Sequence, residues 1–99
     1  MIDFHNIVGF EWDAGNAYKS NEKHDVSQGE AEEMFFNQPL LIAADKEHSI
    51  EEVRYLALGV TGVGRLLSVI FTLRKKATLI RVISARPMSR KERAFYEKA

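Results

Sequence analysis

The sequence predicts a single α+β domain, in which an antiparallel β-sheet is covered by two N-terminal helices and one C-terminal helix. The 99 residues suffice for one hydrophobic core, so residues 1–99 are expected to form one domain. The apolar share of 45% is ordinary for a globular protein. In the second half, apolar runs alternate with spacers short enough for β-hairpins, which predicts sequential antiparallel strands.

The first half is expected to form a strand, two helices and a second strand. Residues 4–12 mix β-branched and aromatic side chains, as strands do. A helix over about 14–23 is weakened by its Gly and Asn content. Residues 27–30, Ser-Gln-Gly-Glu, form a capping box that opens a second helix, which the Asn-Gln-Pro at 37–39 ends. The apolar run at 40–44 predicts the second strand.

The second half is expected to complete the sheet and to end in a helix. Three strands are predicted, over residues 53–60, 65–73 and 78–85. The spacers 61–64 and 74–77 join them as hairpins, and Pro87 ends the sheet. Residues 89–92, Ser-Arg-Lys-Glu, form a second capping box that opens the terminal helix. The predicted order is therefore β-α-α-β-β-β-β-α.

The formal charge of zero conceals a lengthwise division. Residues 1–52 carry 12 acids and 3 Lys or Arg, whereas residues 53–99 carry 11 Lys or Arg and 2 acids. The halves therefore differ in sign, near −9 and +9. A strongly basic half attracts phosphate or an acidic protein, so this charge alone does not distinguish RNA, DNA and protein partners.

Several classes of protein are disfavoured by composition. No cysteine is present, so neither disulfides nor thiolate metal sites can form. No signal-peptide pattern opens the chain, and no apolar run approaches the roughly 20 residues that span a bilayer. We find no phosphate-binding Gly loop, calcium loop or histidine spacing for a metal. A soluble cytoplasmic protein without membrane partner, metal or cofactor is expected.

Two arginines in the last predicted strand are the strongest candidates for a phosphate site. By strict alternation Arg81 shares a face with Leu79 and Ile83, while Arg86 falls on the other side. The guanidinium fork suits phosphate because it donates two parallel hydrogen bonds. The alternative is that Arg81 pairs with an N-terminal carboxylate and that Arg86 only ends the strand.

Further candidates surround this strand. Arg54 and Arg65 begin the two preceding strands and could line the same groove, although exposed arginines are common at strand ends. A basic hairpin turn such as that at 74–76 is usually solvated, although it could touch a nucleic-acid backbone, and the run at 90–93 is most simply a helix surface. His24 lies between Lys23 and Asp25 in a predicted turn, where it can act as a general acid or base or simply be solvated.

Taken together, the motifs resemble one family. They occur in this order: Phe10-Glu11-Trp12-Asp13, Asn21-Glu22-Lys23-His24, Glu30-Ala31, Arg54-Tyr55-Leu56-Ala57-Leu58-Gly59, Arg81-Val82-Ile83-Ser84-Ala85-Arg86 and Glu92-Arg93-Ala94-Phe95-Tyr96-Glu97. The chain resembles the BrnT toxins of bacterial type II toxin–antitoxin systems from about Phe10 to Glu97. The Lys-His turn and the Ile-Ser-Ala-Arg strand end are the most specific parts.

This resemblance implies a RelE-like ribonuclease fold and cleavage of RNA that arrests translation. It also implies neutralisation by a BrnA-like antitoxin with a ribbon-helix-helix part, in a heterotetramer that contacts operator DNA only through the antitoxin. Two positions depart from the family pattern. Asp25 stands where Gly usually follows the Lys-His pair, which suggests an altered turn, and Gln28 stands where Phe is usual.

On this resemblance, metal-free cleavage would use a base for the ribose 2′-hydroxyl, cations for the phosphorane and an acid for the leaving 5′-oxygen. Arg81, Arg86 and Arg65 are expected to hold the phosphate and its transition-state charge. His24 is the first candidate for proton transfer, and Lys23 and Tyr96 are the others. Two other classes remain open: a non-catalytic module that binds an acidic antitoxin segment, and a DNA-binding co-repressor that acts only in complex.

Overall fold

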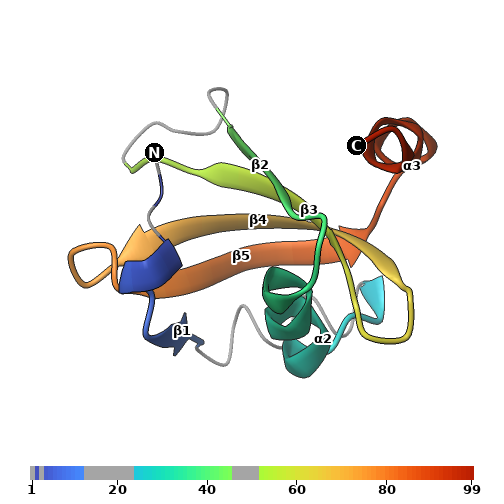
Figure 1. Ribbon diagram of the computed structural model, residues 1–99. Helices are drawn as coiled ribbons and strands as arrows, with labels where there is room; N and C mark the ends of the chain where they lie inside the picture. Colours follow the sequence, from blue (N-terminus) through green and yellow to red (C-terminus); the bar gives the residue numbers. More distant parts are fainter. Residues whose placement is uncertain (1, 3, 13–23, 46–51) are drawn as a thin grey trace.

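A computed structural model describes residues 2, 4–12, 24–45 and 52–99 (Figure 1). The predicted helix over 14–23 and most of the acidic connection before residue 52 lie outside these residues. The described residues form one five-stranded sheet with strand order β1-β5-β4-β3-β2. Helix α2 lies on one face of the sheet and helix α3 on the other (Figure 1). The α+β class is thus confirmed.

The strands agree closely with the sequence expectation in their middle and C-terminal parts. Their bounds are β1 Gly9–Glu11, β2 Leu41–Ala44, β3 Tyr55–Val60, β4 Leu66–Arg74 and β5 Leu79–Pro87. Strands β2 to β5 pair antiparallel with their neighbours in the chain, as the short spacers predicted. Pro87 pairs with Leu67 and is the last residue of the sheet.

The expectation of a wholly antiparallel sheet is wrong, because β1 pairs parallel with β5. The apolar run at 4–12 gives a strand of only three residues, preceded by a 3-10 helix η1 at Phe4–Asn6. The register explains the pairing: Phe10 lies beside Ile80 and Glu11 beside Arg81. An apolar pair therefore faces the core while a charged pair faces the other side, which fixes the position of this short strand.

Both described α-helices begin at the capping boxes that the sequence predicted. Helix α2 spans Gln28–Glu33 and is followed by the 3-10 helix η2 at Met34–Phe36, while α3 spans Arg90–Glu97. Ser27 and Ser89 each accept a hydrogen bond from the backbone N–H three residues later, and the Glu there accepts one in return. Neither of these helices is long and apolar enough to cross a membrane.

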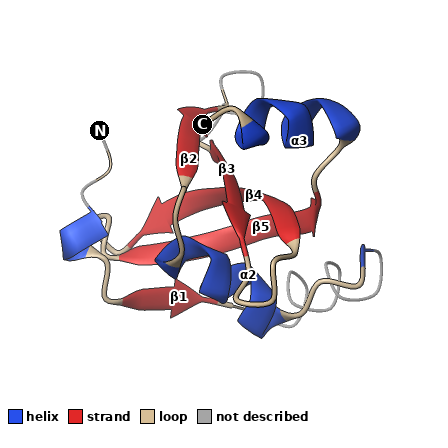
Figure 2. Ribbon diagram, turned by 45° about the vertical axis from the view of Figure 1, so that its right-hand side comes forward, coloured by secondary structure: helices blue, strands red, loops and turns tan. Residues whose placement is uncertain are grey.

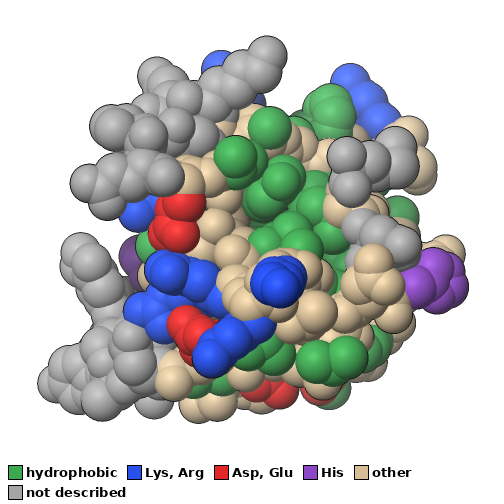
Figure 3. Space-filling model, turned by 90° about the vertical axis from the view of Figure 1, so that its left-hand side faces the viewer, with side chains coloured by type: hydrophobic (Ala, Val, Ile, Leu, Met, Phe, Trp, Pro, Cys, Tyr) green, Lys and Arg blue, Asp and Glu red, His purple; other side chains and the backbone are tan. Residues whose placement is uncertain are grey.

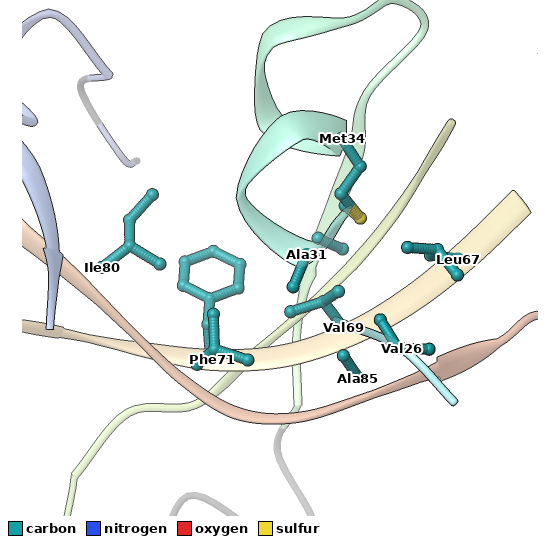
Figure 4. Close-up of a cluster of buried hydrophobic side chains, with 10 residues drawn as sticks. Val26, Ala31, Met34, Leu67, Val69, Phe71, Ile80 and Ala85 are labelled. Carbon is teal, nitrogen blue, oxygen red and sulfur yellow. The ribbon is translucent and has the colours of Figure 1, made fainter. Parts of the chain in front are cut away.

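The main hydrophobic core fills the space between the sheet and α2. Its ten buried residues come from the turn before α2, from α2 and η2, and from β3, β4 and β5. Figure 4 shows Phe71 and Val69 of β4 pointing toward Ala31 and Met34. Aromatic contacts extend this core, because the Phe35 ring stands edge-on to Phe71 with centroids 5.2 Å apart. We call this side of the sheet the α2 face.

The opposite side, the α3 face, is covered only in part. Its buried cluster consists of Leu58, Met88 and Tyr96. Ser68 and Thr72 of β4 are also buried on this side, at 2% exposure each. Helix α3 crosses above one end of the sheet and leaves the rest of this face uncovered by described helices (Figure 2). The α3 face therefore carries both polar and apolar side chains that no described helix covers.

Candidate functional site

A β-bulge in β5 determines where the two candidate arginines point. Ser84 pairs with Ile70 and Val82 with Phe71, so Ile83 is the extra residue of the bulge. Beyond it, the alternation of side chains is reversed. Arg81 lies beside Thr72 and Arg86 beside Ser68. Since residues 68, 70 and 72 of the regular strand β4 share one face, Arg81 and Arg86 both lie on the α3 face. The expectation that they point to opposite sides is wrong.

Arg81 is half-buried and paired with the neighbouring strand. Its Nη1 donates to Glu11 Oε1 at 3.1 Å, and its side chain is 22% exposed. The alternative in which Arg81 pairs with an N-terminal carboxylate is thus confirmed. The guanidinium still lies at a partly open surface, since about a fifth of the side chain is exposed.

Arg86 is bound more tightly than Arg81. Its Nη1 and Nη2 donate to the two carboxylate oxygens of Glu92 at 2.7 and 2.9 Å. Ser68 Oγ donates to the same carboxylate at 3.3 Å, and the Ser89 backbone N–H donates at 2.8 Å. The hydrogen bonds from Arg86, and after them the one from the Ser89 backbone, lower the pKa of Glu92 to about 2. Glu92 therefore links β4, β5 and the start of α3.

A hollow of about 420 Å³ opens beside this cluster on the α3 face. Leu56 and Ile70 form its apolar floor, Arg86 and Glu92 lie at its wall, and Ala43, Ala44 and Asp45 line the remainder. Ile70 lies on β4 between Thr72 and Ser68, so the hollow is between the positions of Arg81 and Arg86 along the sheet. Of the two arginines, Arg86 lines this hollow, whereas the Arg81 guanidinium is hydrogen-bonded to Glu11 on β1 and does not line it.

More cations lie near the same face. By alternation Arg54, directly before β3, lies on the same face as Leu56. At the far end of the sheet, Arg74 pairs with Glu52 at 3.2 Å. Figure 3 views the end of the molecule that carries the β4–β5 turn, where Lys and Arg side chains gather around acidic ones beside hydrophobic surface. Cations here are thus interspersed with carboxylates.

Arg65 and His24 form another group, at the end of the sheet where β4 begins. Arg65 Nη1 donates to the Asp25 carbonyl at 2.7 Å, and Nη2 donates to the His24 carbonyl at 3.4 Å. Nη1 also contacts both carboxylate oxygens of Glu30 at 3.0 Å. Hydrogen bonding from the Ser27 backbone, aided by Arg65, lowers the pKa of Glu30. Arg65 therefore fastens the chain at His24 to α2.

The turn after His24 accommodates the unusual residue there. Asp25 has φ of 53°, in the left-handed region that favours Gly. Asp tolerates this region better than most residues, so the backbone conformation is kept without Gly. The expectation that Asp25 alters the family's turn stays a prediction. Lys23 lies outside the described residues.

Tyr96 is remote from solvent. Its side chain is 6% exposed and its hydroxyl donates to the carbonyl oxygen of Pro39. Burial raises the pKa of this hydroxyl. The contact connects α3 to the segment before β2, so the geometry gives Tyr96 a structural role.

The charge division along the sequence is compensated in part by the ion pairs among the described residues. Three of the ion pairs join an acid of residues 1–52 to an arginine of residues 53–99: Glu11–Arg81, Glu30–Arg65 and Glu52–Arg74. The fourth, Arg86–Glu92, lies within the basic half. The described parts of the chain hold no group of three or more His, Asp or Glu side chains placed to bind a metal ion.

Sequence reasoning missed Glu92, Ser68 and Thr72. Glu92 was recognisable as a capping residue, but its second role depends on the bulge that brings Arg86 onto its face. Ser68 and Thr72 carried a signal that was overlooked, since two hydroxyl residues four apart in an apolar strand share one face.

Comparison with known protein families supplies an independent result. Residues 12–92 match the family described as the ribonuclease toxin, BrnT, of type II toxin–antitoxin systems. The match includes every strand except β1, and it includes Arg81, Arg86 and Glu92. No individual curated protein matches the chain.

Proposed function

Because the chain belongs to the BrnT family of ribonuclease toxins, we propose that it cleaves RNA without a metal ion or cofactor and thereby arrests translation. Membership implies an RNA substrate and a cognate antitoxin. The cytoplasm, where translated RNA is found, is the proposed place of action. The observation that carries the proposal furthest is the common orientation of Arg81 and Arg86 on the α3 face.

In the proposed mechanism, the RNA backbone crosses the α3 face and one phosphate lies above Ile70. Thr72 and Ser68 are four residues apart, so the backbones of Arg81 and Arg86 are separated by about 13 Å along the strands. The two side chains are long enough to converge on one phosphate across that distance once Arg81 releases Glu11 and Arg86 releases Glu92. The guanidinium groups would then stabilise the charge that develops on the phosphorane oxygens. Arg54 would contact the adjoining backbone.

The proposed reaction is an internal transesterification. The ribose 2′-oxygen loses its proton to a base and attacks phosphorus, and the bond from phosphorus to the 5′-oxygen breaks as that oxygen gains a proton. The products are a 2′,3′-cyclic phosphate and a 5′-hydroxyl. The family resemblance makes His24 the first choice for proton transfer and Lys23 the second. The hydrogen bond from Arg65 to the His24 carbonyl places His24 beside α2 and not beside Ile70. Tyr96 is given no part because its hydroxyl is buried.

Arg65 has a supporting role in this proposal. Its guanidinium is engaged with Glu30 and with two backbone carbonyls. Because these contacts hold the guanidinium against α2 and the backbone at His24, Arg65 is proposed to position that turn and not to contact the phosphate above Ile70. Neutralisation is proposed to come from a BrnA-like ribbon-helix-helix antitoxin, in a heterotetramer that contacts operator DNA through the antitoxin alone.

Purified protein and an end-labelled RNA test the function. Arg81→Ala should lower the cleavage rate by about 100-fold or more, the usual effect of removing one group that stabilises transition-state charge. Arg81→Lys should recover only part of the rate, because it keeps the charge and loses the fork. Lys76→Ala, an exposed lysine in the β4–β5 turn, is the matched control and should cleave like the parent.

Equal rates for Arg81→Ala and the parent would refute the assignment of Arg81. Absence of RNA cleavage and of growth arrest by the parent would instead favour a non-catalytic binding module or a co-repressor. The melting temperature of each variant should be measured alongside, since Arg81 also pairs with Glu11.

A further inference from the structure

A second hollow on the α3 face is apolar and lies between α3 and the edge of the sheet. Its volume is about 670 Å³, larger than that of the hollow beside Arg86. Leu41, Ala43, Leu56 and Leu58 form its floor, and Phe95 and Lys91 of α3 form one wall. We call it the β2–α3 groove. The floor residues belong to β2 and β3, and among the described strands β2 is an edge of the sheet.

Helix α3 rests on the sheet through only one stripe of its surface. Glu92 and Tyr96, one turn apart, are its two residues that are not exposed. The adjoining stripe carries Lys91, Phe95 and Lys98, which are spaced by four and three residues. Phe95 is 66% exposed although it lines an apolar groove. An aromatic ring between two lysines is thus left open to a partner.

The charge around the groove indicates what that partner is. Helix α3 and the residue after it carry four cations: Arg90, Lys91, Arg93 and Lys98. Of the two carboxylates in α3, Glu92 is already engaged with Arg86 and Ser89. Lys91 lines the groove, and Lys98 lies on the same stripe of the helix, while Arg86 offsets the charge of Glu92. The wall therefore carries a net positive charge while the floor is aliphatic. An acidic segment with one apolar side complements both surfaces, because the apolar side covers the leucines and the carboxylates meet the lysines.

Other occupants fit the groove less well. An RNA backbone would meet the lysines, but the leucine floor offers its phosphates no hydrogen-bond donors. A second copy of this chain placed with its own α3 in the groove would bring like charges together. An acidic segment with one apolar side matches both the cations and the apolar floor.

We propose that the β2–α3 groove is the docking site for an acidic, amphipathic segment of the cognate antitoxin. This inference rests on the proposed toxin function. Phe95 is the expected anchor of the interface, because a large aromatic ring that becomes buried contributes much of the binding energy. Lys91 supplies charge complementarity at the rim.

The position of the groove also explains neutralisation. Glu92 lines both this groove and the hollow beside Arg86. Leu56 and Ala43 are likewise shared by the two. A segment seated in the groove therefore lies directly against the proposed phosphate site and blocks the approach of RNA without replacing the Arg86–Glu92 pair.

The test uses the full chain and the co-expressed, purified product of the reading frame next to its gene. Their dissociation constant should rise about 30-fold or more for Phe95→Glu, as for an interface hot spot. Lys91→Glu should raise it by a smaller factor and reduce its dependence on salt. Val63→Glu is the matched control: Val63 is 91% exposed in the β3–β4 turn, and its change should leave binding within about twofold, as for a residue outside an interface.

A growth assay separates this inference from the proposed function. Parent, Phe95→Glu and Val63→Glu should all arrest growth when expressed alone, and the antitoxin should rescue all but Phe95→Glu. If the parent arrests growth and Phe95→Glu is rescued as fully as the parent, the docking site is wrong while the toxin function stands. If the parent is harmless, the toxin function fails, and the dissociation constants still decide the docking site.

Two further results would overturn the docking site. One is unchanged affinity in both Phe95→Glu and Lys91→Glu. The other is a dimer of the chain alone that Phe95→Glu dissociates, which would make a second copy the occupant. If Phe95→Glu alters the circular dichroism spectrum, Phe95→Ala provides the same comparison with a smaller change.

Discussion

The two faces of the sheet differ in how completely they are covered. The α2 face buries ten core residues under α2 and its neighbouring turns. The α3 face buries a cluster of three and keeps ion pairs, hydroxyls and two open hollows. Side chains alternate along each strand, so one segment of sequence serves both faces. The α2 face therefore holds the fold together, and the α3 face remains available for partners.

The largest expected difference between the faces concerns stability. Phe71 of the α2 face is fully buried, and Phe71→Ala should lower the free energy of unfolding by about 3–5 kcal/mol. Its neighbour Ile70 faces the α3 side and is only half-buried, so Ile70→Ala should cost less, under about 2 kcal/mol. Urea unfolding of both variants measures the difference. Equal losses of unfolding free energy in the two variants would mean that the two faces contribute equally to stability.

Next in size is the link that Glu92 makes on the α3 face. Glu92→Gln should lower stability at neutral pH by about 2 kcal/mol, since charge-assisted hydrogen bonds and a helix cap are weakened. The folded state lowers the pKa of Glu92 from 4.5 to about 2, so its contribution is present above pH 4.5 and is lost as the pH falls toward 2.

Unfolding measured between pH 7 and pH 2 tests this pH dependence. The parent should lose more stability across the interval from 4.5 to 2 than Glu92→Gln does. Glu97→Gln, an exposed glutamate on the same helix, serves as the control and should follow the parent. Identical pH profiles for the parent and Glu92→Gln would contradict the role assigned to the Arg86–Glu92 pair.

A smaller effect is expected where α3 is attached by Tyr96. Tyr96→Phe removes one hydrogen bond to the Pro39 carbonyl and should lower stability by about 1 kcal/mol. RNA cleavage at a temperature well below the melting point should be unchanged. A loss of cleavage without a loss of stability would indicate that Tyr96 has a catalytic role.

The smallest effect is expected at the turn that leads into the α2 face. Asp25→Gly relieves a left-handed conformation but gives the unfolded chain more freedom, and these effects oppose each other. The net change in the free energy of unfolding should be less than about 1 kcal/mol. A larger loss in thermal unfolding would show that the Asp25 side chain itself holds the turn.

Much of the fold was predictable because its signals are local. Both capping boxes start helices where expected, and the spacers at 61–64 and 74–77 are hairpin turns between antiparallel strands. The parallel pairing of β1 was not predictable from hairpin reasoning, since it joins residues about 70 positions apart. It depends on matching Phe10 and Glu11 to the two faces of β5.

The candidate site was predictable in its residues and not in its geometry. Arg81 and Arg86 were identified by their unusual place in an apolar strand, but strict alternation separated them. The bulge at Ile83 brings them to one face, and no local sequence signal marks it. His24 and Arg65 were also identified, yet the contact through which Arg65 holds two backbone carbonyls arises only when distant segments meet.

The central claim is that Arg81 and Arg86 act together on one phosphate across the α3 face. A double-mutant cycle of single-turnover RNA cleavage, with Arg81→Ala, Arg86→Ala and both together, tests it most directly. Each single variant should lose about 100-fold or more, and the double variant should lose far less than the product of the two losses. Full cleavage by either single variant, or losses that multiply as for independent sites, would contradict the claim.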